Sequence, residues 1–271
     1  MTMQILLGAD PEVFMKRDGK YVNAHNMVQG DKQNPFKVEK GAVQVDGMAL
    51  EFNIDPASSE DEFVSNLECV MNILKGMVPG YELVADPVAV FGKEYIMAQP
   101  PESLILGCDP DFNAWNNGLA NPRPDGDTDF RTGAGHVHIG WTQDADVNDP
   151  SHIEACIMLT KQLDYYLGLG SLIYDKDTKR RTLYGAAGAF RPKPYGVEYR
   201  VLSNAWLKSP KLMRWVYQNT VKAVQDLFEG KAAYNAYHTW AQDAISSKHP
   251  NMFAVKDVMK KLGVRQPPRV A

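Results

Sequence analysis

The stretch GAGHVHIG, residues 133–140, indicates what kind of sheet this chain builds and what that sheet carries. Val137 and Ile139 alternate with two histidines in a β-rich run, which predicts a strand. Because alternate residues of a strand point to the same side, His136 and His138 share one face. The small flanking residues make these imidazoles candidates for a metal ligand and a phosphate contact. The alternative is a pair of core histidines satisfied by hydrogen bonds.

Two carboxylates occur on the predicted first strand, residues 4–14. In the sequence GADPE, Asp10 and Glu12 stand two apart and therefore point to the same face. Their repulsion in an apolar sheet is costly unless a cation or water relieves it, so the pair indicates a site for a hard metal ion. The alternative is a solvated strand end that Pro11 makes irregular.

A hairpin is predicted in VDGMALEFN, residues 45–53, where the Asp-Gly pair is a turn signal. Glu51 and Asn53 share one face of its second strand, and the apolar Leu50 and Phe52 share the other. The polar face can add oxygen ligands to the same site. A half-buried strand with its polar face in water explains the pattern equally well and is the favoured reading for Asn53.

The fourth block is RPKPYGVEYRVLSNAW, residues 191–206. Glu198 and Arg200 share a predicted strand face, and a carboxylate beside a guanidinium can hold a metal ion and an anionic phosphate side by side. A cross-strand surface ion pair, which contributes little to stability, is the alternative.

The remaining pattern predicts an α+β fold with a largely antiparallel sheet, in a single domain spanning residues 1–271. Capping boxes at Ser59 and Ser151 predict helices over 59–77 and 150–168. The chain turns helical from about residue 208, beginning at Ser209-Pro210. Further strands are expected at 20–25, 42–46, 49–54, 82–90, 133–142, 184–191 and 196–203, and further helices at 232–246 and 253–262. The loop-like stretch 98–132 is a candidate active-site flap.

Composition limits the class of protein and its partners. The formal net charge is -4 with no basic stripe, so no nucleic-acid partner is implied. Three widely spaced cysteines suit free thiols in a reducing compartment, which favours the cytoplasm. The N-terminus has no positively charged region and only a short apolar run, so we expect neither a signal peptide nor a membrane anchor. No Walker or dinucleotide-binding glycine motif occurs.

Taken in order from about residue 8 to about 206, these blocks resemble the glutamine synthetase and glutamate-cysteine ligase superfamily, and most of all the short phage-type carboxylate-amine ligases. The resemblance implies a sheet funnel flanked by helices, holding ATP and two or more Mg²⁺ or Mn²⁺ ions, in an enzyme that can be oligomeric. It implies metal ligands at Asp10, Glu12, Glu51, His136 and Glu198, contacts to ATP from His138, Arg181, Arg191 and Lys193, and catalytic roles for Arg200, Arg191 and Glu198.

The implied chemistry is transfer of the ATP γ-phosphoryl group to a carboxylate, and attack of an amine on the acyl phosphate to give an amide, ADP and phosphate. The substrates would be small-molecule or peptide carboxylates and amines. Asp10 is shorter than the usual glutamate, and the sequence contains no recognisable glutamate loop. Phe112 and Trp115 in residues 107–115 are either an aromatic wall for the amine or a packed turn. Rival readings are a metal-dependent hydrolase or cupin-type oxygenase that uses the His-x-His pair, and a catalytically silent binding relative.

Overall fold

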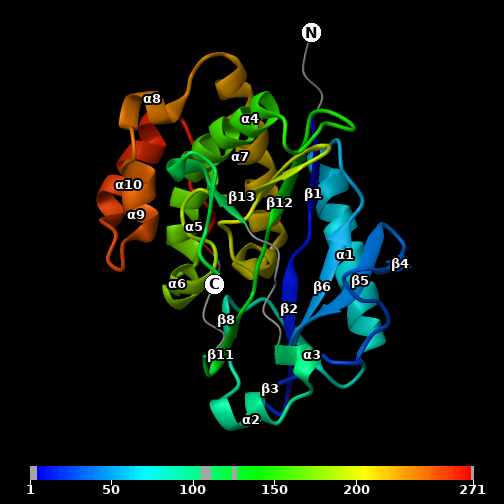
Figure 1. The fold of residues 1–271 in the computed structure, drawn as a ribbon. Coiled ribbons are helices and arrows are strands. Elements are labelled where there is room, and N and C mark those ends of the chain that lie inside the picture. The colour runs from blue at the N-terminus through cyan, green and yellow to red at the C-terminus, as the bar shows by residue number, and fades with distance from the viewer. Residues whose placement is uncertain (1–4, 105–110, 124–126, 270–271) are drawn as a thin grey trace.

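The computed structural model of this chain describes residues 5–104, 111–123 and 127–269, and it contains two large antiparallel sheets (Figure 1). In the first sheet β1 and β12, which come from distant parts of the chain, lie side by side. Its strands, in spatial order, are β1 (Leu6–Ala9), β12 (Val137–Gly140), β14 (Gly196–Tyr199), β13 (Ala189–Lys193), β9 (Phe112–Asn113) and β10 (Leu119–Ala120).

The second sheet is formed by the N-terminal part of the chain. Its strands, in spatial order, are β3 (Lys20–Val22), β2 (Glu12–Arg17), β6 (Ala49–Ile54), β5 (Gly41–Asp46) and β4 (Phe36–Val38), with β7 (Glu82–Val84) also paired to β2. Two further strands, β8 (Val88–Val90) and β11 (Phe130–Thr132), form a separate two-stranded sheet.

The predicted strand 4–14 is broken at Asp10-Pro11, where the chain leaves the first sheet and enters the second. Proline has no N–H to donate to a ladder, so a break there has a direct physical cause. The Glu12 N–H donates to the Ala134 carbonyl at 2.9 Å and ties the two sheets together beside the joint.

The hairpins predicted from Asp-Gly pairs are confirmed. Asp18 and Gly19 both have positive φ, which is the geometry of a two-residue turn between β2 and β3. Gly47 has φ 57° in the turn between β5 and β6. The expected strand 82–90 is interrupted and forms β7 and β8, and the expected strand 184–191 begins only at Ala189.

Helices form the outer layer. The cap at Ser59 is confirmed, because its hydroxyl accepts from the Glu62 N–H. The cap at Ser151 is wrong, since Asp149 caps that helix and Pro150 is its first residue. The expected helix 150–168 is longer and passes through a π-helical turn. The bounds are α1 (Glu60–Met77), α2 (Lys93–Met97), α3 (Pro101–Leu104), α4 (Pro150–Leu163), the π-turn Asp164–Gly168, α5 (Leu169–Tyr174), α6 (Lys179–Leu183), α7 (Pro210–Phe228), α8 (Ala233–Tyr237), α9 (Trp240–Ser246) and α10 (Met252–Lys261).

The C-terminal part is helical as expected, with Ser209 capping α7 and the region 232–246 divided into α8 and α9. The expectation of an α+β fold with antiparallel sheets is therefore confirmed. No helix within the described ranges is long and apolar enough to cross a membrane.

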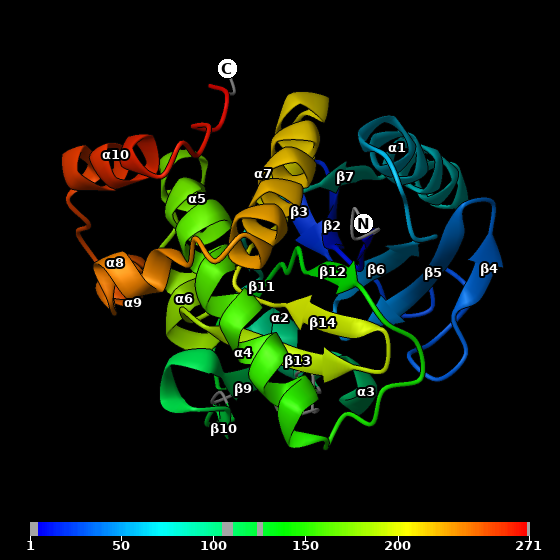
Figure 2. The same ribbon diagram turned by 90° about the horizontal axis from the view of Figure 1, so that it is seen from above.

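The two faces of the sheets have different surroundings. Helix α1 packs on β5 and β6, α4 packs on β13 and β14, and α7 packs against both helices (Figure 2). Alternate strand residues such as Leu7, Val13, Phe52 and Ile139 belong to the core that includes helix residues. Neighbours on the opposite face, among them Gly8, Glu12 and Glu51, line a cavity, so strand alternation places core and site on opposite faces.

Candidate active site

A large cavity of about 940 Å³ follows the face of the sheets that is turned away from the helices. Every second residue from Leu6 to Phe14 lines it. Alternate residues of two further strands contribute in the same way, with His138 and Gly140 on β12 and Arg191 and Lys193 on β13. The lining residues include Leu6, Gly8, Asp10, Glu12, Phe14, Lys32, Asp46, Met48, Ala49, Glu51, Arg131, Thr132, His136, His138, Arg191, Lys193 and Arg200.

A row of functional groups crosses the first sheet because of its register. Gly8 pairs with His138, His138 pairs with Glu198, and Glu198 pairs with Arg191. Paired residues of neighbouring antiparallel strands hold their side chains on the same face. A Cβ added at Gly8 would lie 3.6 Å from the Cβ of His138, so glycine keeps this row open beside the imidazole.

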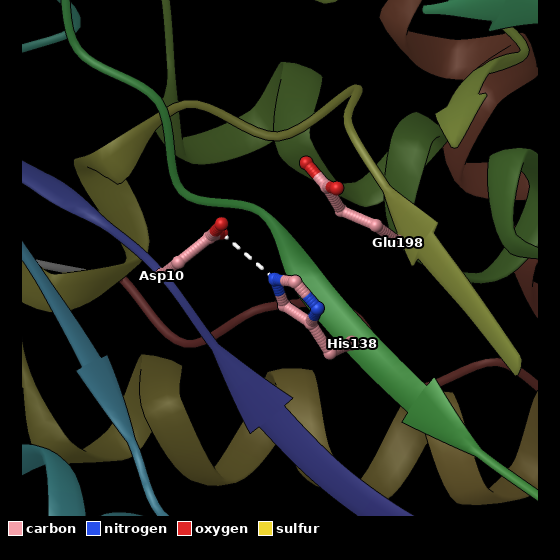
Figure 3. A group of neighbouring side chains, drawn as sticks. All are labelled: Asp10, His138 and Glu198. Carbon is pink, nitrogen blue, oxygen red and sulfur yellow. Dashed lines mark ion pairs between the residues drawn. The ribbon is translucent and has the colours of Figure 1, made fainter. Parts of the chain in front are cut away.

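Asp10, His138 and Glu198 form the first acidic cluster (Figure 3), with one ligand atom from each within 4.8 Å of the others. His138 Nε2 lies 3.0 Å from Asp10 Oδ1, yet within the described ranges neither atom has a hydrogen-bond partner in acceptable geometry. The other ring nitrogen, Nδ1, contacts the Tyr195 hydroxyl closely. That contact fixes the ring and turns Nε2 toward the carboxylates, as is typical of an imidazole that ligates a metal.

His136 precedes β12 and reaches the same cluster from the side. Its Nδ1 lies 3.4 Å from Asp10 Oδ1, 3.3 Å from Glu198 Oε1 and 3.4 Å from Arg200 Nη1. Burial, reinforced by the charge of Arg200, lowers the pKa of His136 to about 4. The ring is therefore neutral near pH 7 and can offer a lone pair.

Glu198 is fully buried and surrounded by cations. Its carboxylate contacts Arg200 Nη1 closely and lies 3.1 Å from Lys193 Nζ and 3.4 Å from Arg191 Nη1. Burial acts to raise the pKa of Glu198, but the charge of Arg200 and the neighbouring histidines outweigh it and hold the pKa at about 2. Because both partners are buried, the reading of Glu198 and Arg200 as a surface ion pair is wrong.

Glu12, Asp46 and Glu51 form the second acidic cluster. Glu12 and Glu51 are directly paired across β2 and β6, and Glu51 also faces Gln44, which donates to it at 2.8 Å. Burial, together with the charge of Asp46, raises the pKa of Glu12 to about 7. Burial and the neighbouring carboxylates raise the pKa of Glu51 well above its usual range. The cluster thus lacks sufficient positive charge of its own.

Both clusters have the chemistry of sites for hard cations. Carboxylates crowd together in each, and the buried Asp10 Oδ1 and His138 Nε2 have no hydrogen-bond partner among the described residues. Buried carboxylates that repel one another are stabilised by a divalent ion, and oxygen donors with one imidazole suit Mg²⁺ or Mn²⁺. The residues present therefore fit two such ions.

The structure brings together all the residues that the sequence named except one. Asp10, Glu12, Glu51, His136, His138, Arg191, Lys193 and Arg200 line the cavity, and Glu198 contacts four of them. Arg181 is the exception. It lies on α6, pairs with Asp175 at 3.5 Å, donates to the Asp177 carbonyl at 3.1 Å and does not line the cavity. An ATP contact from Arg181 has no support in this geometry.

Two groups at the site were not identified as such from the sequence. Asp46 was treated only as a turn signal, although it ends a strand paired to the one that carries Glu51. The stretch 98–132 is predicted to be a loop, whereas Arg131 at its end belongs to β11 and lines the cavity. Its position five residues before His136 was the available signal.

Of the stretch 107–115, the structure describes residues 111–115, and residues 107–110 lie outside the described ranges. The described part packs against neighbouring elements. Phe112 packs on Phe190 at 6.0 Å between ring centroids, and Trp115 donates to Asp164 at 2.6 Å. Asp111, at the start of this segment, lies 3.5 Å from Arg200 Nε. The packed-turn reading thus describes Phe112 and Trp115 within this part of the chain.

Part of the sequence matches one known protein family. Residues 128–259 match the family described as phage phiEco32-like COOH.NH2 ligase-type 2, which confirms over that segment the resemblance to phage-type carboxylate-amine ligases. Asp10, Glu12 and Glu51 lie outside the matched segment. No curated protein matches the sequence.

Among solved structures, the chain is similar to a bifunctional glutathione synthetase from Pasteurella multocida. The TM-score is 0.45 and the sequence identity is 12%, and the similarity covers 97% of this chain and 47% of that one. The chain therefore spans about half the length of that protein.

Proposed function

We propose that this chain, whose residues 128–259 match the phage carboxylate-amine ligases, is an ATP-dependent ligase that joins a carboxylate to an amine. The observation that supports this most is the arrangement of two acidic clusters next to Arg191, Lys193 and Arg200 in one cavity. An enzyme that brings an anionic carboxylate to an anionic phosphate needs clustered charges of both signs more than it needs a nucleophile.

Asp10, His138 and Glu198 would hold one Mg²⁺ or Mn²⁺ ion, and Glu12, Asp46 and Glu51 would hold another. When bound, such ions supply positive charge that neutralises the phosphate oxygens during transfer. His136 is neutral and lies at the edge of the first cluster, where it can complete the set of donors.

Arg191 and Lys193 stand on one face of β13 and point their cationic groups toward Glu198. These two residues would bind the phosphates of ATP. Arg200 would contact the γ-phosphoryl group while it is transferred to the carboxylate. Arg200 is held by Glu198 on one side and by Asp111 on the other, so its guanidinium is fixed before the substrate arrives. Fixed donors of this kind stabilise developing charge without reorganising.

The proposed reaction has two steps. A carboxylate oxygen of the substrate attacks the γ-phosphorus and ADP leaves, giving an acyl phosphate. The amine then attacks the acyl carbon, loses a proton and expels phosphate.

The decisive test supplies ATP, Mg²⁺ or Mn²⁺, and pools of carboxylates and amines to the purified protein. We expect ADP and phosphate to form only when both a carboxylate and an amine are present. Glu12→Gln should abolish this, whereas Glu82→Gln, an exposed substitution on β7, should not. AMP and pyrophosphate as the main products would contradict the acyl-phosphate route, and release of phosphate without any joined product would favour a hydrolase.

A further inference from the structure

Arg131 is a buried cation for which the described protein provides no counter-charge. The residue is 7% exposed. Its Nη1 donates to the Phe130 carbonyl at 2.9 Å and lies 3.4 Å from the Thr128 hydroxyl, while Nε is buried without a partner. Burial lowers the pKa of Arg131, and no neighbouring charge among the described residues offsets that effect. A guanidinium in this position is costly unless a group beyond these residues pairs with it.

This guanidinium lies at one end of the cavity. The long axis of the cavity follows the chain from Leu6 in β1, past Asp10 at the joint, to Glu12 and Phe14 in β2, where strands advance by about 3.3 Å per residue. Arg131 pairs with Ala89 in β11 and β8, and Ala89 packs against Phe14 and Ala49. Arg131 is therefore beyond Glu12, at the end away from Leu6.

The groups proposed to bind ATP lie toward the other end. Lys193 pairs with Gly196, and Gly196 pairs with Gly140, which lies opposite Leu6. The second acidic cluster lies between Lys193 and Arg131. A substrate that reacts at the acidic clusters can thus extend toward Arg131 without meeting the groups proposed to bind ATP.

The chemistry of this end selects one kind of anion. Nη1 already contacts two protein oxygens and Nε is buried, so an anion would contact the part of the guanidinium that faces the cavity. Phe14, Met48 and Ala49 line the same end and give it apolar walls. Lys32 also lines the cavity, but it lies 3.8 Å from Asp46. One cation facing apolar walls suits a singly charged carboxylate on a short carbon chain better than a phosphate dianion.

We propose that Arg131 binds a second, non-reacting carboxylate of a substrate, so that one of the joined molecules is a dicarboxylate or an amino acid with a free carboxylate. This inference rests on the proposed ligase function. It assigns Arg131 a role in substrate specificity, and the carboxylate that it binds belongs either to the acyl donor or to the amine.

The test measures binding, independently of turnover. Calorimetric titrations with Mg²⁺ and a non-hydrolysable ATP analogue present would use two ligand series. One series consists of the dicarboxylates from succinate to pimelate with their monoamides, which represents the acyl donor. The other consists of glycine, alanine and glutamate with their C-terminal amides, which represents the amine.

We expect the protein to prefer the acid over its amide in one series, and Arg131→Gln to weaken binding of that acid by at least about tenfold, to the level of the amide. Arg131→Lys should be intermediate, because it keeps the charge but loses the fork. Arg17→Gln, an exposed substitution on β2, should leave binding unchanged. The series that shows the preference identifies which substrate carries the carboxylate.

A second measurement excludes a structural role. Arg131→Met removes an unpaired buried charge, so it should keep or raise the melting temperature of the ligand-free protein. A clear loss of stability, or the absence of any acid-over-amide preference in both series, would overturn the proposal. Binding of the ATP analogue should be equal in wild type and Arg131→Gln. If carboxylates bind through Arg131 but ADP never forms, the ligase proposal fails and the carboxylate site stands.

Discussion

Glu12 and Glu51 lie directly opposite each other on the neighbouring antiparallel strands β2 and β6. Like charges in that relationship are destabilising, and the raised pKa values of both groups reflect it. Two half-buried carboxylates kept in register at this cost support our proposal that a cation binds between them.

Replacing Glu51 by glutamine should therefore make the thermal stability of the protein largely independent of Mg²⁺ or Mn²⁺. In wild type we expect Mg²⁺ or Mn²⁺ to raise the melting temperature, because a ligand that binds only the folded state stabilises it. Glu51→Gln should be at least as stable as wild type without metal and should lose most of the metal-induced increase. Thermal unfolding with and without metal measures both effects, with Glu82→Gln as the control. An unchanged metal response in Glu51→Gln would remove Glu51 from the set of ligands.

Gly135 should not tolerate even a methyl group. A Cβ there would lie 2.4 Å from the Ser203 carbonyl oxygen and 2.5 Å from Trp206 Nε1, which donates to the Gly135 carbonyl. We expect Gly135→Ala to lower the free energy of unfolding by roughly 1–3 kcal/mol, the usual cost of overpacking. Gly76→Ala is the matched control. It lies in α1 with nothing within 4 Å of the added atom and should stabilise by about 0.5–1 kcal/mol. Equal stabilities in chemical denaturation would show that the close approach at Gly135 relaxes without cost.

The sequence predicted the parts of the site that follow from strand alternation. Asp10, Glu12, His136, His138 and Glu198 all lie where a period of two places them, because one face of each strand must pack on helices. The break at Pro11 and the assignment of β1 and β2 to different sheets depend on long-range pairing, which local patterns do not encode. Asp46 reads locally as part of a turn and Arg131 as part of a loop, and the pairing of their strands with β6 and β8 places them at the cavity. Arg181 was misplaced because its helix α6 does not face the cavity.

Asp164 should make folding stability depend on pH. It is fully buried in the π-helical turn and accepts hydrogen bonds from Trp115 at 2.6 Å and from the Tyr199 hydroxyl at 2.7 Å. Burial raises its pKa from 3.8 to about 7 despite these bonds. The folded state thus holds a proton that the unfolded chain releases, so this contribution to stability is complete below pH 3.8 and is lost as pH rises through about 7.

The measurement is the difference in unfolding free energy between wild type and Asp164→Asn. At pH 5 the variant should be less stable, because an amide cannot accept from both donors. The difference should shrink by roughly 2–3 kcal/mol by pH 8, as wild type loses its advantage. Asp243→Asn, an exposed substitution on α9, should show no such trend. A difference that stays constant from pH 5 to pH 8 would mean that Asp164 is ionised throughout.

Glu198 and Arg200 are in direct contact but are assigned different roles, so their conservative variants should differ. Glu198→Gln keeps the size of the side chain and removes its charge. It should weaken binding of one metal ion and be partly rescued by more Mg²⁺ or Mn²⁺, because mass action offsets the loss of a ligand. The variant also leaves Arg191, Lys193 and Arg200 without their shared counter-ion, so we expect a lower melting temperature as well.

Arg200→Lys keeps the charge and loses the planar fork that contacts Glu198 on one side and Asp111 on the other. If Arg200 meets the phosphoryl group in flight, turnover should fall by roughly 10²-fold or more even at saturating metal and ATP, since a transition-state donor is lost. Added metal should not restore it. Steady-state rates of ADP formation over a range of Mg²⁺ concentrations distinguish the two variants, with circular dichroism to confirm that both are folded. Wild-type turnover by Arg200→Lys at saturation would make Arg200 a scaffold residue that holds Glu198 and Asp111, and the phosphoryl contact would have to come from Arg191 or Lys193.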